Sequence, residues 1–207
     1  MLVVAAALAV AAVDWWAVSG DRVRTEYWAK PSVMVLLIVA VVADGGFDDT
    51  VTVLVAVAFT WSLVGDVVLM LPKGPFEGGL GAFLVAHLCT IAAFTVAGPE
   101  PAWLVVGVVL VGAAAVRLAP PIVRAAATQA AVLGWAVAVY VIVLGVMAVF
   151  GVGVGHWATI GGGLLFLVSD ALLGWGRFVG PTPGARVGVH VTYHLAQAAF
   201  ATWVITA

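Results

Sequence analysis

The sequence of 207 residues has little charge, because eight Lys or Arg and ten Asp or Glu make up only 9% of it. An average soluble domain has roughly 25% charged residues. Here 65% of the residues are hydrophobic and the mean hydropathy is +1.22. This composition excludes an ordinary soluble domain and predicts an all-α, polytopic membrane protein. The net charge of −2 and the lack of a basic patch in the sequence argue against a nucleic acid or another polyanion as partner.

Cysteine is nearly missing as well. Cys89 is the single cysteine and lies in an apolar stretch, so no intrachain disulfide is possible. The cysteine content therefore does not indicate whether the protein lies in an oxidising or a reducing compartment. Residues 2–13 are not preceded by a positively charged region or followed by a cleavage site of the A-x-A type. We therefore expect a first membrane span there rather than a removed signal peptide, and one transmembrane domain over residues 1–207.

Apolar stretches, by contrast, are abundant. A helix needs roughly 17–25 apolar residues to cross a bilayer. Eight candidate spans follow one another at 2–18, 31–43, 50–71, 80–97, 102–119, 128–150, 154–174 and 185–206. The second is short, since its residues would rise only about 20 Å as a helix. Lys30 and Pro31 are expected to begin it, because proline suits a first helical turn.

The basic residues decide whether the short stretch spans. With eight spans, all eight fall on one side of the membrane: Arg22, Arg24, Lys30, Lys73, Arg117, Arg124, Arg177 and Arg186. With seven spans they divide three against five, and the positive-inside bias is lost. We therefore predict eight transmembrane helices with both termini extracytoplasmic, and we expect a bacterial cytoplasmic membrane.

Two short matches indicate an internal repeat. Residues 63–66 match residues 167–170, each ending in Asp, at an offset of 104. Residues 81–87 match residues 184–190, each opening with Gly-Ala and ending in His, at an offset of 103. Each half would contain four spans, an even number, so the halves would share one orientation. We predict two parallel four-helix repeats, 1–98 and 101–207, related by a pseudo-two-fold axis along the membrane normal.

Strongly polar side chains within the predicted spans gather at one membrane level. Asp66 and Asp170 lie about 8–9 Å from the cytoplasmic ends of their spans, at the rise of an α-helix. By the same count His87, His190 and His194 lie roughly 6–12 Å inside. A charged side chain in hydrocarbon costs at least about 2.5–3.5 kcal/mol, so several at one level indicate a shared polar cavity toward the cytoplasmic leaflet.

Other interpretations of the polar residues stay open. Asp14, close to the charged 20–30 loop, is expected to reach headgroup water. His190 and His194 have a spacing that can bind zinc, but no Glu follows His190, and we predict no metal and no cofactor. Ser62 or Ser169 beside a histidine could act as a nucleophile, although the G-x-S-x-G motif is absent from the sequence. A membrane transporter, or a binding protein for a lipid or small polar solute, would also bury charges, but nearer the midplane.

The motifs around these residues resemble those of the YhhN-like lysoplasmalogenase family. They are KP at 30–31, SLVGD at 62–66, GA-x4-H at 81–87, LVSDALL at 167–173, RF at 177–178 and TYHLAQ at 192–197. The resemblance covers most of the chain. It implies an eight-span hydrolase that cleaves the vinyl ether bond of lysoplasmalogens to a fatty aldehyde and glycerophosphocholine or glycerophosphoethanolamine. The implied partners are a lysophospholipid substrate and membrane lipids, and the oligomeric state stays unknown.

The two aspartates suit that chemistry. A vinyl ether is protonated on carbon, and water then captures the resulting oxocarbenium ion. Two carboxylates in different environments can supply the acid, the negative charge and the base, as they do in glycoside hydrolases. We expect Asp66 and Asp170 to share these roles, in an order that the sequence leaves open, with His87 and His190 tuning them.

The substrate-binding residues are predicted from the same region of the chain. Lys30 and Arg177 are expected to bind the phosphate near the cytoplasmic interface, because both are cationic at that level. The remaining predicted substrate-binding residues are Tyr193, His194, Gln197, Ser62 and Ser169.

Overall fold

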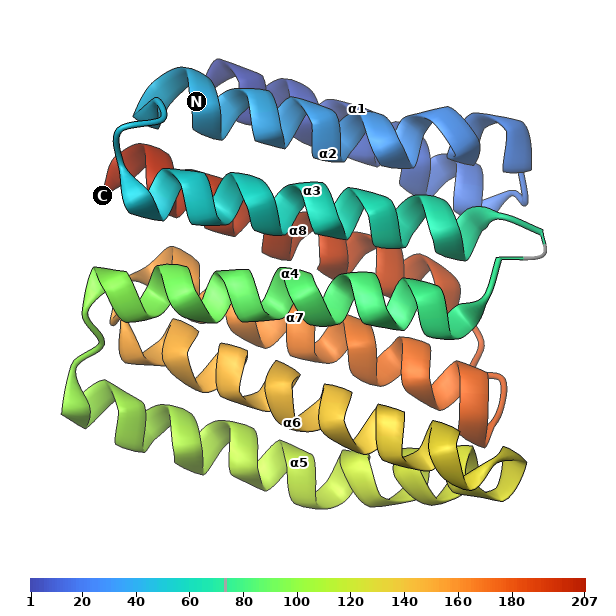
Figure 1. The fold of residues 1–207 in the computed structure, drawn as a ribbon. Helices are drawn as coiled ribbons and strands as arrows, with labels where there is room; N and C mark the ends of the chain where they lie inside the picture. The colour runs from blue at the N-terminus through green and yellow to red at the C-terminus, as the bar shows by residue number, and fades with distance from the viewer. Residues whose placement is uncertain (73) are drawn as a thin grey trace.

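The computed structural model describes residues 1–72 and 74–207, and its regular structure in these ranges is entirely helical, as predicted. Lys73 lies outside the described residues. The helices are α1 (Leu2–Ser19), α2 (Val23–Gly45), α3 (Thr50–Met70), α4 (Phe76–Ala97), α5 (Pro101–Gln129), α6 (Ala131–Gly153), α7 (Trp157–Gly174), a π-helical turn η1 (Trp175–Val179) and α8 (Ala185–Thr206). Successive helices run antiparallel, and both termini lie at the same end of the bundle (Figure 1).

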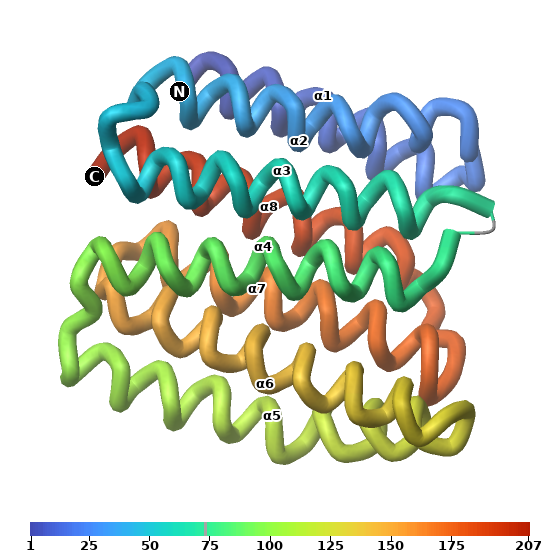
Figure 2. The backbone as a smooth tube through the Cα atoms, in the orientation of Figure 1, coloured from blue at the N-terminus to red at the C-terminus, as the bar shows by residue number. Residues whose placement is uncertain are grey.

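Seven helices, α1 to α7, are long and apolar enough to cross a bilayer, the seventh together with η1. The architecture is therefore that of a polytopic membrane protein. The helix left out, α8, packs against α1, α2, α3 and α7. Figure 2 shows α8 running along the bundle behind α3 and α4. Its buried face holds the polar residues His190, His194 and Gln197, which lower its hydropathy.

The second helix is longer than predicted. α2 begins at Val23 rather than at residue 31 and continues to Gly45. Pro31 is therefore inside the helix, so the carbonyl of Tyr27 has no i+4 N–H donor. The first turns of α2 were missed because they contain Glu26 and Lys30, which read as loop residues; in the structure both are buried.

The fifth helix also exceeds its predicted range of 102–119. α5 continues past Pro120 and Pro121 to Gln129, so Arg124 is helical instead of lying in the gap after residue 119. α5 is also peripheral, since only four of its residues are buried. α6 and α7 begin later than predicted, at residues 131 and 157 rather than 128 and 154.

The start of α3 is fixed by a side-chain cap. Oδ2 of Asp49 accepts hydrogen bonds of 2.7 Å from both the hydroxyl and the backbone N–H of Thr52. These bonds, the hydroxyl one first, hold the pKa of Asp49 below its usual value. The cap defines the short connection from α2 to α3.

The basic residues share one half of the bundle. The seven that the structure describes belong to the half in which α1 joins α2, α5 joins α6 and α7 joins α8 (Figure 1). In that half, α7 and α8 come together around Ser169, whose hydroxyl donates to the carbonyl of Val189 at 3.1 Å. This contact sets the polar part of α7 directly against the polar part of α8.

Candidate active site

A cavity of about 440 Å³ lies mainly between α2, α3, α7 and α8, in the half of the bundle that contains the basic residues. It is lined by seven acidic or basic side chains: Glu26, Lys30, Asp66, Asp170, Arg177, Arg186 and His190. Such a density of charge inside a membrane domain marks a candidate functional site.

Asp66 on α3 is held by partners from two other helices. Its Oδ1 lies 2.9 Å from Nζ of Lys30 on α2, and its Oδ2 accepts a hydrogen bond of 2.7 Å from the hydroxyl of Tyr193 on α8. Asp66 is 0% exposed and Lys30 is 8% exposed. Asp66 and Lys30 therefore form a buried ion pair on the cavity wall, in which each charge compensates the other.

Asp170 on α7 has a different set of partners. The hydroxyl of Tyr140 on α6 donates to its Oδ2 at 2.5 Å, and Nε2 of His87 on α4 lies 3.0 Å from that hydroxyl. Nε2 of His87 is 3.5 Å from the same carboxylate oxygen. Asp170 thus has a tyrosine and a histidine beside it, where Asp66 has a lysine and a tyrosine.

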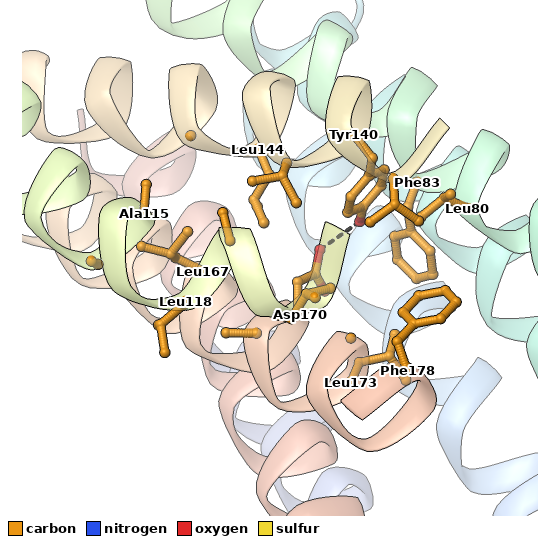
Figure 3. Close-up of a pocket in the computed structure, with 18 of the residues that line it drawn as sticks. Leu80, Phe83, Ala115, Leu118, Tyr140, Leu144, Leu167, Asp170, Leu173 and Phe178 are labelled. Carbon is orange, nitrogen blue, oxygen red and sulfur yellow. Dashed lines mark hydrogen bonds between the residues drawn. The ribbon is translucent and has the colours of Figure 1, made fainter. Parts of the chain in front are cut away.

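A second, apolar pocket of about 80 Å³ adjoins the polar cavity. Side chains of α4, α5, α6 and α7 line it, and Figure 3 shows Leu144 and Leu167 on one side of Asp170 and Phe178 on the other. The two spaces share four lining residues: Leu69, Phe83, Asp170 and Leu173. Asp170 is the one carboxylate among the described residues of the apolar pocket, so it lies where the polar space meets the apolar one.

A chain of charged side chains lies beside the cavity. Asp14 on α1 was expected to reach headgroup water, but it is 0% exposed, because it faces α8, where Nδ1 of His190 lies 2.6 Å from its Oδ2. Nε2 of His190 is 3.7 Å from Oε1 of Glu26, and Oε2 of Glu26 is bound by Arg186. His190 therefore contacts Asp14 and Glu26, and the described contacts do not join it to either proposed catalytic carboxylate.

Three predicted substrate-binding residues do not line the cavity. Ser62, His194 and Gln197 are all buried away from it. The indole N–H of Trp15 donates to Nδ1 of His194 at 3.1 Å, which leaves the proton of a neutral His194 on Nε2. Of the two predicted serines, Ser169 does line the cavity, although its hydroxyl is engaged by a backbone carbonyl.

Arg177 is in the π-helical turn η1, at the edge of the cavity. Its guanidinium lies 5.2 Å from the ring centre of Phe76 and 5.4 Å from that of Phe178. No carboxylate lies within ion-pair distance of Arg177 among the described residues. Its charge is therefore available to an anion that enters the cavity.

Several residues of the site escaped the sequence analysis: Tyr140, Glu26, Tyr27 and Arg186. Tyr140 carried a usable signal, since it is the one hydroxyl-bearing residue in α6. The part of the chain that the structure describes contains no group of three or more His, Cys, Asp or Glu residues placed to hold a metal ion.

Comparisons with known proteins agree with the resemblance noted above. A family model described as the YhhN family matches residues 25–204. The lysoplasmalogenase TMEM86B of pig is 32% identical over 168 residues, which are 79% of this chain and 67% of the pig protein. The human protein of that name is 32% identical over 159 residues, 74% of this chain and 62% of the human protein. The rat one is 31% identical over 172 residues, 81% of this chain and 67% of the rat protein. The chain thus spans about two thirds of the length of these relatives, and no solved structure gives a significant match.

Proposed function

Because the chain belongs to the YhhN family, we propose that it hydrolyses the vinyl ether bond of lysoplasmalogens to a fatty aldehyde and glycerophosphocholine or glycerophosphoethanolamine. The observation that carries this proposal is the position of Asp170 between a polar cavity and an apolar pocket. A lysoplasmalogen presents a polar headgroup, then a vinyl ether, then a hydrocarbon chain. With the headgroup in the cavity and the chain in the pocket, the vinyl ether lies at Asp170.

We assign the acid to Asp170 and the stabilising charge to Asp66. Asp170 gives its proton to the alkenyl carbon β to the ether oxygen, where the electron pair of the double bond forms the new C–H bond. The positive charge that develops on the adjacent carbon and oxygen is stabilised by the Asp66 carboxylate, which Lys30 and Tyr193 hold in the cavity wall. Lys30 was expected to bind the phosphate, but in this mechanism it holds the Asp66 carboxylate in place.

Water then adds to the cationic carbon. The Asp170 carboxylate takes a proton from this water, and the product is a hemiacetal. The hemiacetal O–H loses its proton as the C–O bond to glycerol breaks, and the glycerol oxygen gains one. The products are the aldehyde and a free hydroxyl on glycerol, and Asp170 is again an acid. Tyr140 and His87 hold the Asp170 carboxyl in place during both proton transfers.

Arg177 is the residue that we assign to the phosphate. Its planar guanidinium can bind two phosphate oxygens at once, and it has no acidic partner among the described residues. The direct test of the proposed function is incubation of the purified protein with a lysoplasmalogen and measurement of free aldehyde. A transporter would bind the lipid in the same test but release no aldehyde.

Filling the apolar pocket is expected to impair use of long-chain substrates. Ala115 lines this pocket from α5, so Ala115→Phe would occupy the space that we assign to the alkenyl chain. We expect kcat/KM for a long-chain lysoplasmalogen to fall at least about tenfold, mainly through KM, as for a lost hydrophobic binding contact. Ala113→Phe is the matched control, since Ala113 is exposed on the same helix and does not line the pocket. An equal loss in both variants would argue against this assignment of the pocket.

We also propose that the halves 1–98 and 101–207 are repeats. Asp66 on α3 has its partners on α2 and α8, and Asp170 on α7 has its partners on α6 and α4. Exchange of the two halves converts one set of helices into the other. This correspondence supports a pseudo-two-fold axis that passes between the two carboxylates.

For the membrane we propose eight spans, with both termini extracytoplasmic and the cavity toward the cytoplasmic leaflet. Support comes from α8, which runs antiparallel to α7 and packs against three further helices, and from the clustering of the described basic residues in one half.

This topology predicts the behaviour of reporter fusions. A reporter fused after Ala207 is expected to be extracytoplasmic, and one inserted at Lys73 is expected to be cytoplasmic, because positively charged segments stay inside. Paired alkaline phosphatase and fluorescent protein fusions measure the two sides. A cytoplasmic reporter after Ala207 would contradict both the span count and the leaflet that we assign to the cavity.

A further inference from the structure

A cluster of acidic and basic side chains lies where α1, α2 and α8 meet beside the cavity. Contacts of 2.6 Å from His190 to Asp14 and 3.7 Å from His190 to Glu26 join α1, α8 and α2. Arg186 then binds Glu26 and, at 2.8 Å, Asp21 in the connection between α1 and α2. Of this cluster, Glu26, Arg186 and His190 line the cavity, whereas Asp14 and Asp21 do not. Arg177, from η1, also lines the cavity, and it has no acidic partner among the described residues.

Glu26 is the carboxylate of this cluster that lines the cavity. Its side chain is only 8% exposed, and it lines the cavity. Oε2 is bound by Arg186, but the nearest described partner of Oε1 is Nε2 of His190 at 3.7 Å, which is beyond hydrogen-bond reach. Because Glu26 lines the cavity and its Oε1 has no hydrogen-bond donor among the described residues, this oxygen can accept a hydrogen bond from a ligand.

A zwitterionic headgroup matches this distribution of charge. We propose that Glu26 binds the ammonium group of a lysophospholipid headgroup while Arg177 binds its phosphate. Glu26 would then select substrates that have an amine over those that end at the phosphate. Tyr27 lines the same cavity and adds an aromatic ring, whose face attracts cations. His190 and Arg186 are positioning residues, since they hold Glu26 in place. The proposal rests on the function proposed above and adds the part of the headgroup that the protein recognises.

The selectivity is measured with two alkenyl substrates of the same chain length, one with glycerophosphoethanolamine and one with glycerophosphate as headgroup. We expect the wild-type protein to favour the amine-bearing substrate by at least about tenfold in kcat/KM, as one charge-assisted hydrogen bond would provide. Glu26→Gln should reduce that ratio at least about fivefold, and chiefly through KM for the amine-bearing substrate. Glu26→Asp keeps the charge and should retain part of the ratio.

Glu77→Gln is the matched control. Glu77 is exposed in the first turn of α4, in the same half of the bundle, and it does not line the cavity, so the ratio should stay at the wild-type value. Melting temperatures of the variants in detergent show whether each is folded. A ratio that changes equally in Glu26→Gln and Glu77→Gln would be a general charge effect and would overturn the assignment.

A binding measurement separates this proposal from the proposed reaction. Saturated alkyl ether analogues with the same two headgroups contain no vinyl ether, so their Kd values report recognition alone. We expect the phosphoethanolamine analogue to bind at least about tenfold more tightly than the phosphate analogue, and Glu26→Gln to reduce the difference. If the two Kd values are equal in the wild-type protein, the proposal is wrong even where lysoplasmalogens are cleaved. If the difference holds but no lysoplasmalogen is cleaved, the proposed reaction fails and the recognition of the ammonium group stands.

Discussion

Replacement of Asp170 by Asn is expected to lower the rate of vinyl ether cleavage by at least about 10²-fold, the usual contribution of a positioned acid. Asn has nearly the same size and can still accept the hydrogen bond from Tyr140, but it has no acidic proton to give to carbon. The loss should therefore appear in kcat, with KM little changed, in assays of aldehyde release. Near-normal turnover of this variant would remove Asp170 from the mechanism.

Asp66→Asn is expected to cause a loss of similar size, because the developing oxocarbenium ion loses its stabilising charge. If the two carboxylates act as one unit, the double variant should be little slower than the slower single variant. Asp44→Asn is the control, since Asp44 is exposed near the opposite end of α2. Two fully additive losses would mean that Asp66 and Asp170 act independently.

Asp66→Asn also raises a question of stability, because it leaves the ammonium of Lys30 buried without its partner. Breaking a buried ion pair on one side costs about 3–5 kcal/mol. A second variant, in which Lys30→Met accompanies Asp66→Asn, removes both charges and should recover much of the melting temperature. It should not recover activity. Recovered activity would show that Asp66 serves folding rather than catalysis.

The membrane level at which the polar side chains gather could be predicted from the sequence, because a charged side chain inside an apolar stretch is too costly to leave in hydrocarbon. Asp66 and Asp170 are each the one charged residue of their predicted stretch, Lys30 directly precedes another stretch, and the structure brings all three to one cavity. His87 was predicted to act on the carboxylates, and it lies 3.5 Å from Asp170. These residues could be found from the sequence because the cost of burying a charge can be judged for each residue from its neighbours in the sequence.

The partners of these residues could not be predicted, since partnership depends on how the helices pack. The sequence of α1 does not indicate that Asp14 faces His190, which is 176 residues away. Glu26 lies in the predicted 20–30 loop and Arg186 at the start of the last predicted span, and only packing shows that they meet beside a cavity. The helix bounds predicted at two prolines were wrong as well. Pro31 and Pro120 suggest helix ends, but in the structure α2 and α5 continue through them.

A lysophospholipid with a saturated alkyl ether and the same headgroup is expected to bind but never to be cleaved. The first step that we propose puts a proton on carbon, and this needs the electron pair of the double bond, which the saturated chain lacks. The rate should therefore fall below detection rather than by a modest factor. The analogue should act as a competitive inhibitor of vinyl ether cleavage, because its headgroup and chain still fit the cavity and the pocket. Release of alcohol or aldehyde from this analogue would rule out the oxocarbenium route.

The same step leaves an isotopic mark. In heavy water the proton that Asp170 delivers is a deuteron, so the aldehyde should carry one solvent deuterium on the carbon next to its carbonyl. The aldehyde must be trapped as it forms, for example by reduction to the alcohol, because free aldehydes exchange that position with water. Mass spectrometry of the trapped alcohol counts the label, and an aldehyde taken through the same trapping in heavy water without enzyme gives the background. Unlabelled product would mean that carbon is not protonated from solvent-exchangeable groups, and the roles assigned to Asp170 and Asp66 would both be lost.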